Sequence, residues 1–117
     1  MNPNFTSQLE QVHVQAWNEK DATKRNSLLK EIYADDIRMY DREFILDGLP
    51  AVSDFIGKLL AEDAAFRFES ARPIETLQNG ARLFGKITTS GGILNSMDFF
   101  IIENEKVKHL YAFMEAS

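Results

Sequence analysis

Two polar side chains fall inside apolar stretches of the sequence, where an imidazole and a carboxyl group could transfer protons. His13 lies on the apolar face of a predicted helix, between Leu9 and Trp17, and Asp98 lies in a predicted strand among apolar neighbours. An imidazole titrates near neutral pH and can serve as a hydrogen-bond donor or as an acid–base group. A carboxyl group that is turned inward favours its neutral form and could then donate to a developing oxyanion.

Each candidate also has a structural interpretation. His13 could be a core histidine that donates to a backbone carbonyl, and Asp98 could be an exposed strand residue or one half of an ion pair. Asp41 ends a predicted strand, where an aspartate often belongs to a turn. The apolar residues Phe100 and Ile102, on the same face of the strand as Asp98, favour the interior and functional interpretation of that residue.

Helices are predicted in the first half of the chain, because its apolar residues recur at intervals of three and four. The predicted helices cover about residues 7–19, 22–33 and 50–62. Thr6 or Ser7 could cap the first of them through a side-chain oxygen.

Strands are predicted in the second half, because the apolar spacing changes to two after Ala65. The expected strands run from Phe66 towards Leu77 and over 81–90, 93–103 and 106–115, and two shorter ones lie at 37–39 and 44–46. The expected hairpin turns are Asn79–Gly80, Gly91–Gly92 and Asn104–Glu105. Helices and strands in separate blocks predict one α+β domain over residues 1–117, with an antiparallel meander.

The composition excludes several classes of function. The chain has 117 residues, with 18 Asp and Glu against 13 Lys and Arg, a net charge of −5 and no cysteine. Disulfides, thiolate nucleophiles and cysteine metal sites are therefore absent. An acidic chain without basic clusters argues against nucleic acid as a partner. The longest apolar run is too short to cross a bilayer, so no membrane partner is expected.

No cofactor or metal is expected either. The sequence has no phosphate-binding glycine motif, and its two histidines lack the spacing of metal ligands. The first residues have no basic region followed by an apolar core, so a signal peptide is not expected. A cytoplasmic location is therefore expected.

The last two predicted strands are apolar on both faces. In the final strand Leu110, Ala112 and Met114 alternate with His109, Tyr111 and Phe113. Three helices can cover only one face of such a sheet, so the other face is expected to pack on a second copy of the chain. A homodimer through the sheet is therefore predicted.

The order of elements and several stretches of sequence resemble the NTF2-like, or SnoaL-like, superfamily. The stretch AWNEKDATKRNSLLKEIYADDIRMYD is similar to the helix–helix–strand opening of that superfamily, DGLPAVSDFI to its third helix and MDFFIIENEKVKHLYAF to its closing hairpin. The resemblance covers nearly the whole chain. It implies an α+β cone, in which three N-terminal helices pack on a curved, mainly antiparallel sheet.

Within the superfamily, three residues resemble the site of ketosteroid isomerases. Those enzymes use one aspartate as general base and a second, protonated aspartic acid as oxyanion donor. Asp41 matches the position of the first and Asp98 that of the second, while His13 stands where the enzyme has a donating tyrosine. The resemblance implies Asp41 as base, with His13 and Asp98 as donors. It also implies a cavity, whose expected lining residues are Trp17, Tyr33, Tyr40, Phe55, Phe100, Leu110, Ala112 and Met114.

These expectations favour an isomerase-like or lyase-like enzyme. It would perform isomerisation, dehydration or cyclisation on a small hydrophobic carbonyl compound held in the cone. A SnoaL-like cyclase relies chiefly on a single cavity aspartate, a role that Asp98 could also fill. The alternative is a non-catalytic ligand-binding protein or dimeric scaffold of the same fold.

Overall fold

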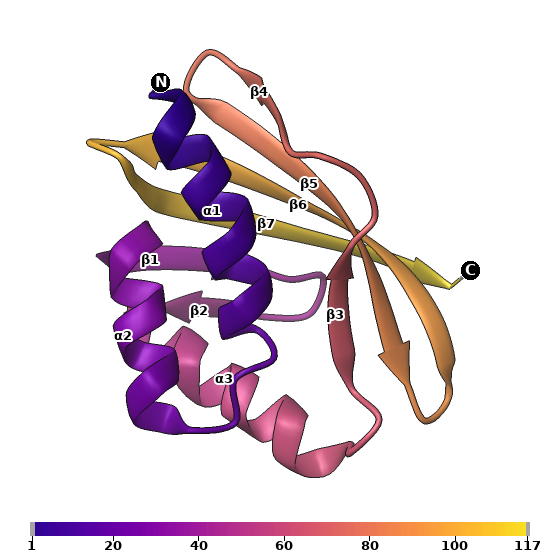
Figure 1. Cartoon of the computed structure of the whole chain (residues 1–117). Coiled ribbons are helices and arrows are strands. Elements are labelled where there is room, and N and C mark those ends of the chain that lie inside the picture. The colour runs from indigo at the N-terminus through magenta and orange to yellow at the C-terminus, as the bar shows by residue number, and fades with distance from the viewer. Residues whose placement is uncertain (1, 117) are drawn as a thin grey trace.

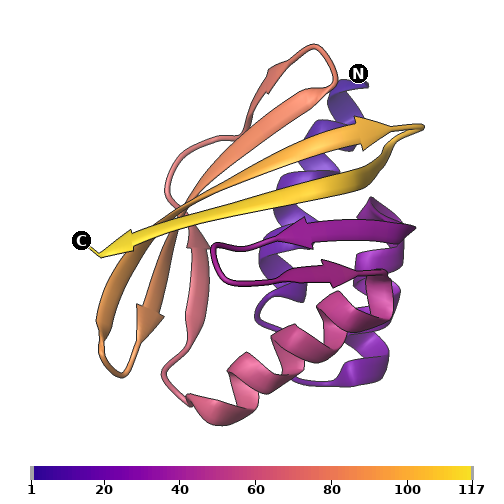
Figure 2. The ribbon, with the colours of Figure 1, turned by 180° about the vertical axis from the view of Figure 1, so that it is seen from behind.

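The computed structural model describes residues 2–116 and contains three helices and a strongly curved sheet (Figure 1). The helices are α1 (Pro3–Ala16), α2 (Ala22–Ile32) and α3 (Leu49–Glu62). Helix α1 crosses one side of the sheet, and the view from behind in Figure 2 has the strands in front of it. Helix α3 packs against α2 and against the first two strands.

The sheet is mixed and has seven strands. They are β1 (Tyr33–Tyr40), β2 (Ile45–Asp47), β3 (Arg67–Ser70), β4 (Glu75–Leu77), β5 (Gly80–Thr89), β6 (Gly92–Glu103) and β7 (Lys106–Ala116). Their order is β2-β1-β7-β6-β5-β3, with β4 paired to β5. Strands β1 and β7 are parallel and all other pairs are antiparallel. The α+β class and the mainly antiparallel sheet agree with the sequence prediction.

Strands β1 and β7 separate where the cone opens. Their pairing ends at Tyr40 and Tyr111, after which β1 turns at Asp41 towards β2 while β7 continues to Ala116. A register shift between β6 and β7 at Ile101 adds a local bend. One side of the last five residues of β7 is therefore left without a strand partner.

Helix α1 begins at Pro3, four residues before its predicted start. Its cap is Asn2, whose side chain accepts a hydrogen bond from the backbone N–H of Asn4, and Pro3 occupies the first helical position. The predicted cap at Thr6 or Ser7 is wrong. The helix ends at Ala16, and the side chain of Asn18 then bonds to both backbone groups of Phe68 on β3.

The strand predicted from Phe66 towards Leu77 is two strands, β3 and β4. Pro73 lies between them and has no N–H with which to continue the pairing. The following turn is also displaced by one residue, because Leu77 pairs with Gly80 and leaves Gln78 and Asn79 as the turn. Gln78, with φ of 56°, adopts the left-handed conformation there.

The two later turns lie close to their predicted places. Thr89 pairs with Gly92, so the turn there consists of Ser90 and Gly91. The turn at Asn104 and Glu105 is confirmed: both residues have positive φ, as a two-residue type I′ hairpin requires.

The core fills the space between the helices and the concave side of the sheet. Leu9, Leu29 and Ile56 come from the three helices, and Ile37 and Leu110 come from β1 and β7; all five are fully buried. Removing such apolar surface from water is the main stabilising contribution to the fold. The same concave side carries the polar residues of the site.

Candidate functional site

A buried hydrogen bond joins the two polar residues that the sequence analysis singled out. Nε2 of His13 lies 3.0 Å from Oδ2 of Asp98. Helix α1 places His13 on its buried face, and the alternation of β6 turns Asp98 to the concave side of the sheet. His13 is fully buried and Asp98 is 8% exposed. The hydrogen-bond partner of His13 is thus a side-chain carboxyl group and not the backbone carbonyl that the sequence also allowed.

Two further side chains extend this bond into a chain. The hydroxyl oxygen of Tyr33 lies 2.6 Å from Nδ1 of His13. Nε1 of Trp17 donates to the same hydroxyl oxygen over 3.0 Å. Both residues are buried, so neither has water as an alternative partner. The order of the chain is therefore Trp17, Tyr33, His13 and Asp98.

The donors and acceptors of this chain fix the positions of its protons. The indole of Trp17 can only donate, so the oxygen of Tyr33 accepts from it. The buried O–H of Tyr33 has one remaining acceptor, which is Nδ1 of His13. His13 then carries its proton on Nε2 and donates it to Asp98. Asp98 accepts this bond through Oδ2.

Other proton arrangements leave a buried group unsatisfied. A doubly protonated His13 would donate from Nδ1, and an acid proton on Oδ2 of Asp98, donated to Nε2, would also require a proton on Nδ1; either way the O–H of Tyr33 would lose its acceptor. An unsatisfied buried hydroxyl costs about 1–3 kcal/mol. The network therefore excludes an acid proton on Oδ2 of Asp98, whereas a neutral acid with its proton on Oδ1 fits the same bonds. The pKa of Tyr33 is raised well above its usual value, chiefly by burial, so this hydroxyl keeps its proton.

Asp98 forms the polar end of a cavity of about 210 Å³. Its Oδ2 is held by His13, whereas Oδ1 makes no hydrogen bond within residues 2–116. Aromatic side chains form much of the wall, namely those of Trp17, Phe55, Phe66 and Phe68. The volume is below the roughly 300–1,000 Å³ of pockets for drug-sized ligands. The cavity therefore suits a small molecule with an apolar body.

Three more carboxyl groups line the cavity, at Asp41, Glu62 and Asp63. Both oxygens of Asp63 accept hydrogen bonds, Oδ1 from the N–H of Ala65 and Oδ2 from Ser90. These bonds, above all those from the backbone, lower the pKa of Asp63. Asp63 thus joins the end of α3 to the β5–β6 turn.

Asp41 lies where β1 ends and the cavity opens. Its Oδ2 accepts a long bond of 3.3 Å from the N–H of Glu43, and its own N–H donates to the carbonyl of Phe44. Asp41 is thus both a turn residue and a lining residue of the cavity. It is half-buried, whereas Asp98 is almost enclosed.

The structure distributes the predicted cavity residues over three places. Trp17, Phe55, Ala112 and Met114 line the cavity with Asp41 and Asp98. Tyr33, Phe100 and Leu110 are fully buried core residues that do not line it, and His13 lies behind Asp98. Tyr40 lies on the other face of the sheet, where its ring stacks on Tyr111 at 4.3 Å.

Several lining residues were not predicted. They include Met39, Leu59, Phe66, Phe68, Ile87 and Leu94. The alternation of Phe66 and Phe68 already placed these two side chains on one face, but that pattern does not distinguish a core from a cavity wall. The distinction depends on where β7 separates from β1.

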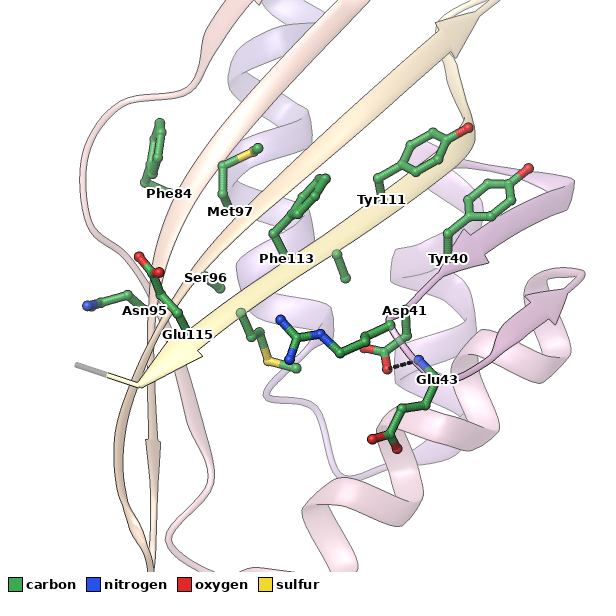
Figure 3. A pocket seen from close by; sticks show the side chains of 13 residues that line it. Tyr40, Asp41, Glu43, Phe84, Asn95, Ser96, Met97, Tyr111, Phe113 and Glu115 are labelled. Carbon is green, nitrogen blue, oxygen red and sulfur yellow. Dashed lines mark hydrogen bonds between the residues drawn. The ribbon is translucent and has the colours of Figure 1, made fainter.

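A second hollow, of about 880 Å³, lies along the outer side of β7 (Figure 3). Phe84, Met97 and Phe113 face it from three adjacent strands, and Tyr40 and Tyr111 stand together at its upper end in that view. Phe113 is 57% exposed. No described element covers this apolar strip.

Within the described part of the chain, no three His, Asp or Glu side chains gather in a way that could hold a metal ion. None of the three helices is long and apolar enough to span a membrane, as judged over residues 2–116.

Comparison with known proteins gives matches in structure only. No protein-family model matches the chain, and no curated protein sequence is similar to it. A proposed isomerase of the SnoaL-like family from Agrobacterium tumefaciens str. C58 aligns with a TM-score of 0.84 and 19% identity, over 97% of this chain and 99% of the other. A proposed SnoaL-like polyketide cyclase from Jannaschia sp. CCS1 aligns with a TM-score of 0.74 and 11% identity, over 98% and 90%.

A third match is a hypothetical protein with a ketosteroid isomerase-like fold from Catenulispora acidiphila DSM 44928, in complex with trimethylamine. Its TM-score is 0.74 at 11% identity, over 97% of this chain and 86% of the other. Further matches are described as NTF2-like proteins of unknown function. The chain therefore has the fold of the NTF2-like and SnoaL-like proteins, as the sequence resemblance predicted. At these identities the matches show the fold alone.

Proposed function

We propose that this protein is a small-molecule enzyme in which Asp98 transfers a proton within the cavity. The observation that carries the proposal is the geometry of Asp98: one carboxylate oxygen is held by neutral His13, and the other is free towards an apolar cavity. A partly desolvated carboxylate in a fixed orientation has the properties of a general base. Its substrate would be a small hydrophobic compound with an acidic C–H beside a carbonyl group.

The proposed reaction needs one carboxylate that accepts a proton and then returns it. Oδ1 of Asp98 takes the proton from carbon, and the electron pair of the C–H bond moves into the substrate. Return of the proton to another carbon gives isomerisation, and its delivery to a departing hydroxyl group gives dehydration. Nε2–H of His13 donates to Oδ2 throughout, so the imidazole stays neutral and orients the carboxylate.

This assignment exchanges the roles expected from the ketosteroid isomerase resemblance. Asp98, rather than Asp41, becomes the base in this proposal, because His13 holds Oδ2 of Asp98 in place and leaves Oδ1 for the substrate. Asp41, at the opening, would contact a polar group of the substrate. The resemblance to SnoaL-like cyclases, with a single cavity aspartate, fits this arrangement better. Structural matches described as isomerases and polyketide cyclases support the same class of chemistry.

Exchange of carbon-bound hydrogen tests the proposal directly. Cyclohexanone and 4-piperidone are ring ketones of equal size, and exchange of their α-hydrogens in D₂O can be followed by NMR. The wild-type protein is expected to accelerate the exchange of at least one of them. Asp98→Asn, which can still accept from His13, should reduce that acceleration by about 10²–10⁴-fold. Glu105→Gln, in the β6–β7 turn, makes the same charge change outside the cavity and should leave it unchanged.

Equal acceleration by the wild-type protein and Asp98→Asn would refute the assignment of Asp98. Exchange that is no faster with the wild-type protein than in buffer, for both ketones, would refute the enzyme proposal. The thermal unfolding of each variant is measured in parallel, so that a loss of exchange can be separated from a loss of fold.

A non-catalytic ligand-binding protein is the second candidate, and one observation favours it. Among the described lining residues, the indole and hydroxyl donors are both engaged: Nε1 of Trp17 donates to Tyr33, and the hydroxyl group of Thr89 donates to the carbonyl of Gly92. Oxyanion donors are often the largest contribution to catalysis at a carbonyl group. The bound trimethylamine of the Catenulispora acidiphila protein supports small-molecule binding by this fold. Binding without exchange in the experiment above would select this candidate.

The homodimer stays a prediction for the outer face of the sheet. Phe113, Tyr111 and Met97 form an apolar strip there, and the helices cover the other face. The same strip on two copies can pair about a twofold axis.

A further inference from the structure

The charge of the cavity has one sign. Four carboxyl groups line it, from Asp41, Glu62, Asp63 and Asp98, and among the described residues no Lys, Arg or His side chain does. Two of these carboxyl groups have partners in the protein. Asp63 is saturated by protein donors, and Glu62 lies 3.9 Å from Lys58 at the exposed end of α3.

Asp98 is the group on which charge matters most. It is 8% exposed, its Oδ1 has no partner among the described residues, and within residues 2–116 the side chain that hydrogen-bonds to its Oδ2 is that of His13. An ionised carboxylate that is removed from water is unfavourable unless it is paired. A cation bound in the cavity would supply that pair, and an anion would add to the repulsion.

The walls of the cavity suit the same kind of ligand. The rings of Trp17, Phe55 and Phe68 line the cavity together with Asp98, and Phe66 lies with them. The faces of aromatic rings attract cations, and indole does so most strongly. Aromatic walls with a carboxylate at one end are complementary to an ammonium group that carries apolar carbon.

We infer that the cavity selects small, positively charged ligands, namely protonated amines with an apolar body, over neutral molecules of the same shape. The inference rests on the site of the proposed function and names the charge of its substrate. It also accounts for the missing oxyanion donor, because a substrate that brings its own positive charge can stabilise negative charge that develops beside it. The volume of about 210 Å³ limits the ligand to a size below that of drug-like compounds.

Binding of unreactive probes tests the inference without any turnover. Piperidine is protonated at neutral pH, and tetrahydropyran has the same ring with oxygen in place of the charged nitrogen. Cyclohexanecarboxylate is the anionic probe. NMR titrations should give a dissociation constant for piperidine that is at least about tenfold lower than that for tetrahydropyran, as a charge-assisted hydrogen bond implies. Cyclohexanecarboxylate should show no saturable binding.

Two variants locate the selectivity. Asp98→Asn keeps an acceptor for His13 and removes the charge, so the preference for piperidine over tetrahydropyran should fall to about twofold or less. Glu105→Gln removes one charge from the β6–β7 turn and should keep the wild-type preference. If the preference for piperidine persists in Asp98→Asn, it arises from the other carboxyl groups of the cavity, those of Asp41, Glu62 and Asp63, and the role of Asp98 is overturned. Equal affinities of the wild-type protein for piperidine and tetrahydropyran, or no binding of piperidine, would overturn the inference itself.

The two proposals fail separately. Selective binding of piperidine without exchange of either ketone would support the cationic cavity and refute the enzyme. Exchange of cyclohexanone as fast as that of 4-piperidone, without selectivity between the probes, would support the enzyme and refute the charge preference. Faster exchange of 4-piperidone, lost in Asp98→Asn, would support both.

Discussion

The hydroxyl group of Tyr33 lies 2.6 Å from Nδ1 of His13, and this contact determines which nitrogen of the imidazole carries the proton. Because Trp17 donates to the same hydroxyl, Tyr33 must donate onward. The other imidazole nitrogen then donates to Asp98, 85 residues away in the sequence. A core tyrosine and a core tryptophan thereby make Oδ2 of the carboxyl group in the cavity a hydrogen-bond acceptor.

Tyr33→Phe should destabilise the protein and disturb this tautomer. The substitution leaves Nε1 of Trp17 and Nδ1 of His13 without partners, each buried. We expect a loss of about 1–3 kcal/mol of unfolding free energy, measured by urea denaturation. Nitrogen chemical shifts of His13 should change from the pure Nε2–H form to a mixture.

Tyr111→Phe is the matched control for that substitution. The ring of Tyr111 stacks on Tyr40 at 4.3 Å, and its hydroxyl group makes no hydrogen bond within residues 2–116. A change within about 0.5 kcal/mol is expected, as for most surface positions. An unchanged His13 tautomer in Tyr33→Phe would show that the proton placement derived above is incorrect.

Stability should fall in alkali because of Tyr33. Burial, the main cause, raises the pKa of this residue in the folded state well above the value of 10.0, so the folded protein holds the proton that the unfolded chain releases. The stability contribution is complete below pH about 10 and is lost as the pH rises above it, at up to about 1.4 kcal/mol per pH unit. Urea midpoints between pH 9 and 11 (a window set by the tyrosine pKa of about 10) check this.

The comparison with Tyr33→Phe isolates that residue from the other groups that titrate in alkali. Lys108 also has a raised pKa, chiefly through its hydrogen bond to Asp36, and it contributes equally to both proteins. The wild-type curve should therefore fall more steeply than that of the variant. Parallel curves would mean that Tyr33 does not keep its proton in the folded state.

Gly85→Ala should destabilise the sheet beneath α1. A Cβ atom at this position would lie 2.5 Å from Oγ of Ser96 and 2.8 Å from Cζ of Phe68. Ser96 and Phe68 are both buried, so neither can move away freely. Overpacking of this kind costs about 1–3 kcal/mol, measurable as a lower urea midpoint.

Gly91→Ala is the control for that prediction. Its Cβ would meet only Oγ1 of Thr89, at 3.8 Å, in an exposed turn. The unfolding free energy should change by less than about 0.5 kcal/mol. If both alanine variants are equally stable, close packing at Gly85 is not a constraint on the fold.

Phe113→Glu tests the predicted homodimer. Phe113 is 57% exposed on the outer face of β7, next to Met97 and Tyr111. If two copies meet through this face, a buried glutamate at each centre should convert the dimer into a monomer, as seen by light scattering after size-exclusion chromatography. Lys58→Glu, at an exposed position of α3, is the control and should keep the wild-type mass. A wild-type mass of one chain at all concentrations would contradict the prediction.

The sequence by itself determined the elements and the faces of the two central residues. Apolar spacings of three and four, then of two, are local properties, because each follows from the geometry of a single helix or strand. They placed His13 on the buried face of α1 and Asp98 on the concave side of the sheet. They also placed Phe113 opposite that side. These assignments need no knowledge of which elements become neighbours.

Some errors of the prediction were local too. The apolar spacing predicts that a helix ends at Tyr33, whereas this residue begins β1. Because side chains alternate along a strand, Tyr33 and Tyr40, seven positions apart, lie on opposite faces of the sheet and cannot line one cavity. The missing first turn of α1 and the break at Pro73 are errors of the same kind.

Only the tertiary structure decided how the residues act together. The bond between His13 and Asp98 depends on how α1 lies across β6, and that packing is set by the whole core. The direction of the proton in Tyr33 depends on Trp17, which belongs to another element. The cavity exists because β7 continues after β1 has turned at Asp41. Long-range packing therefore placed a predicted strand aspartate beside His13 and against an acidic, aromatic cavity.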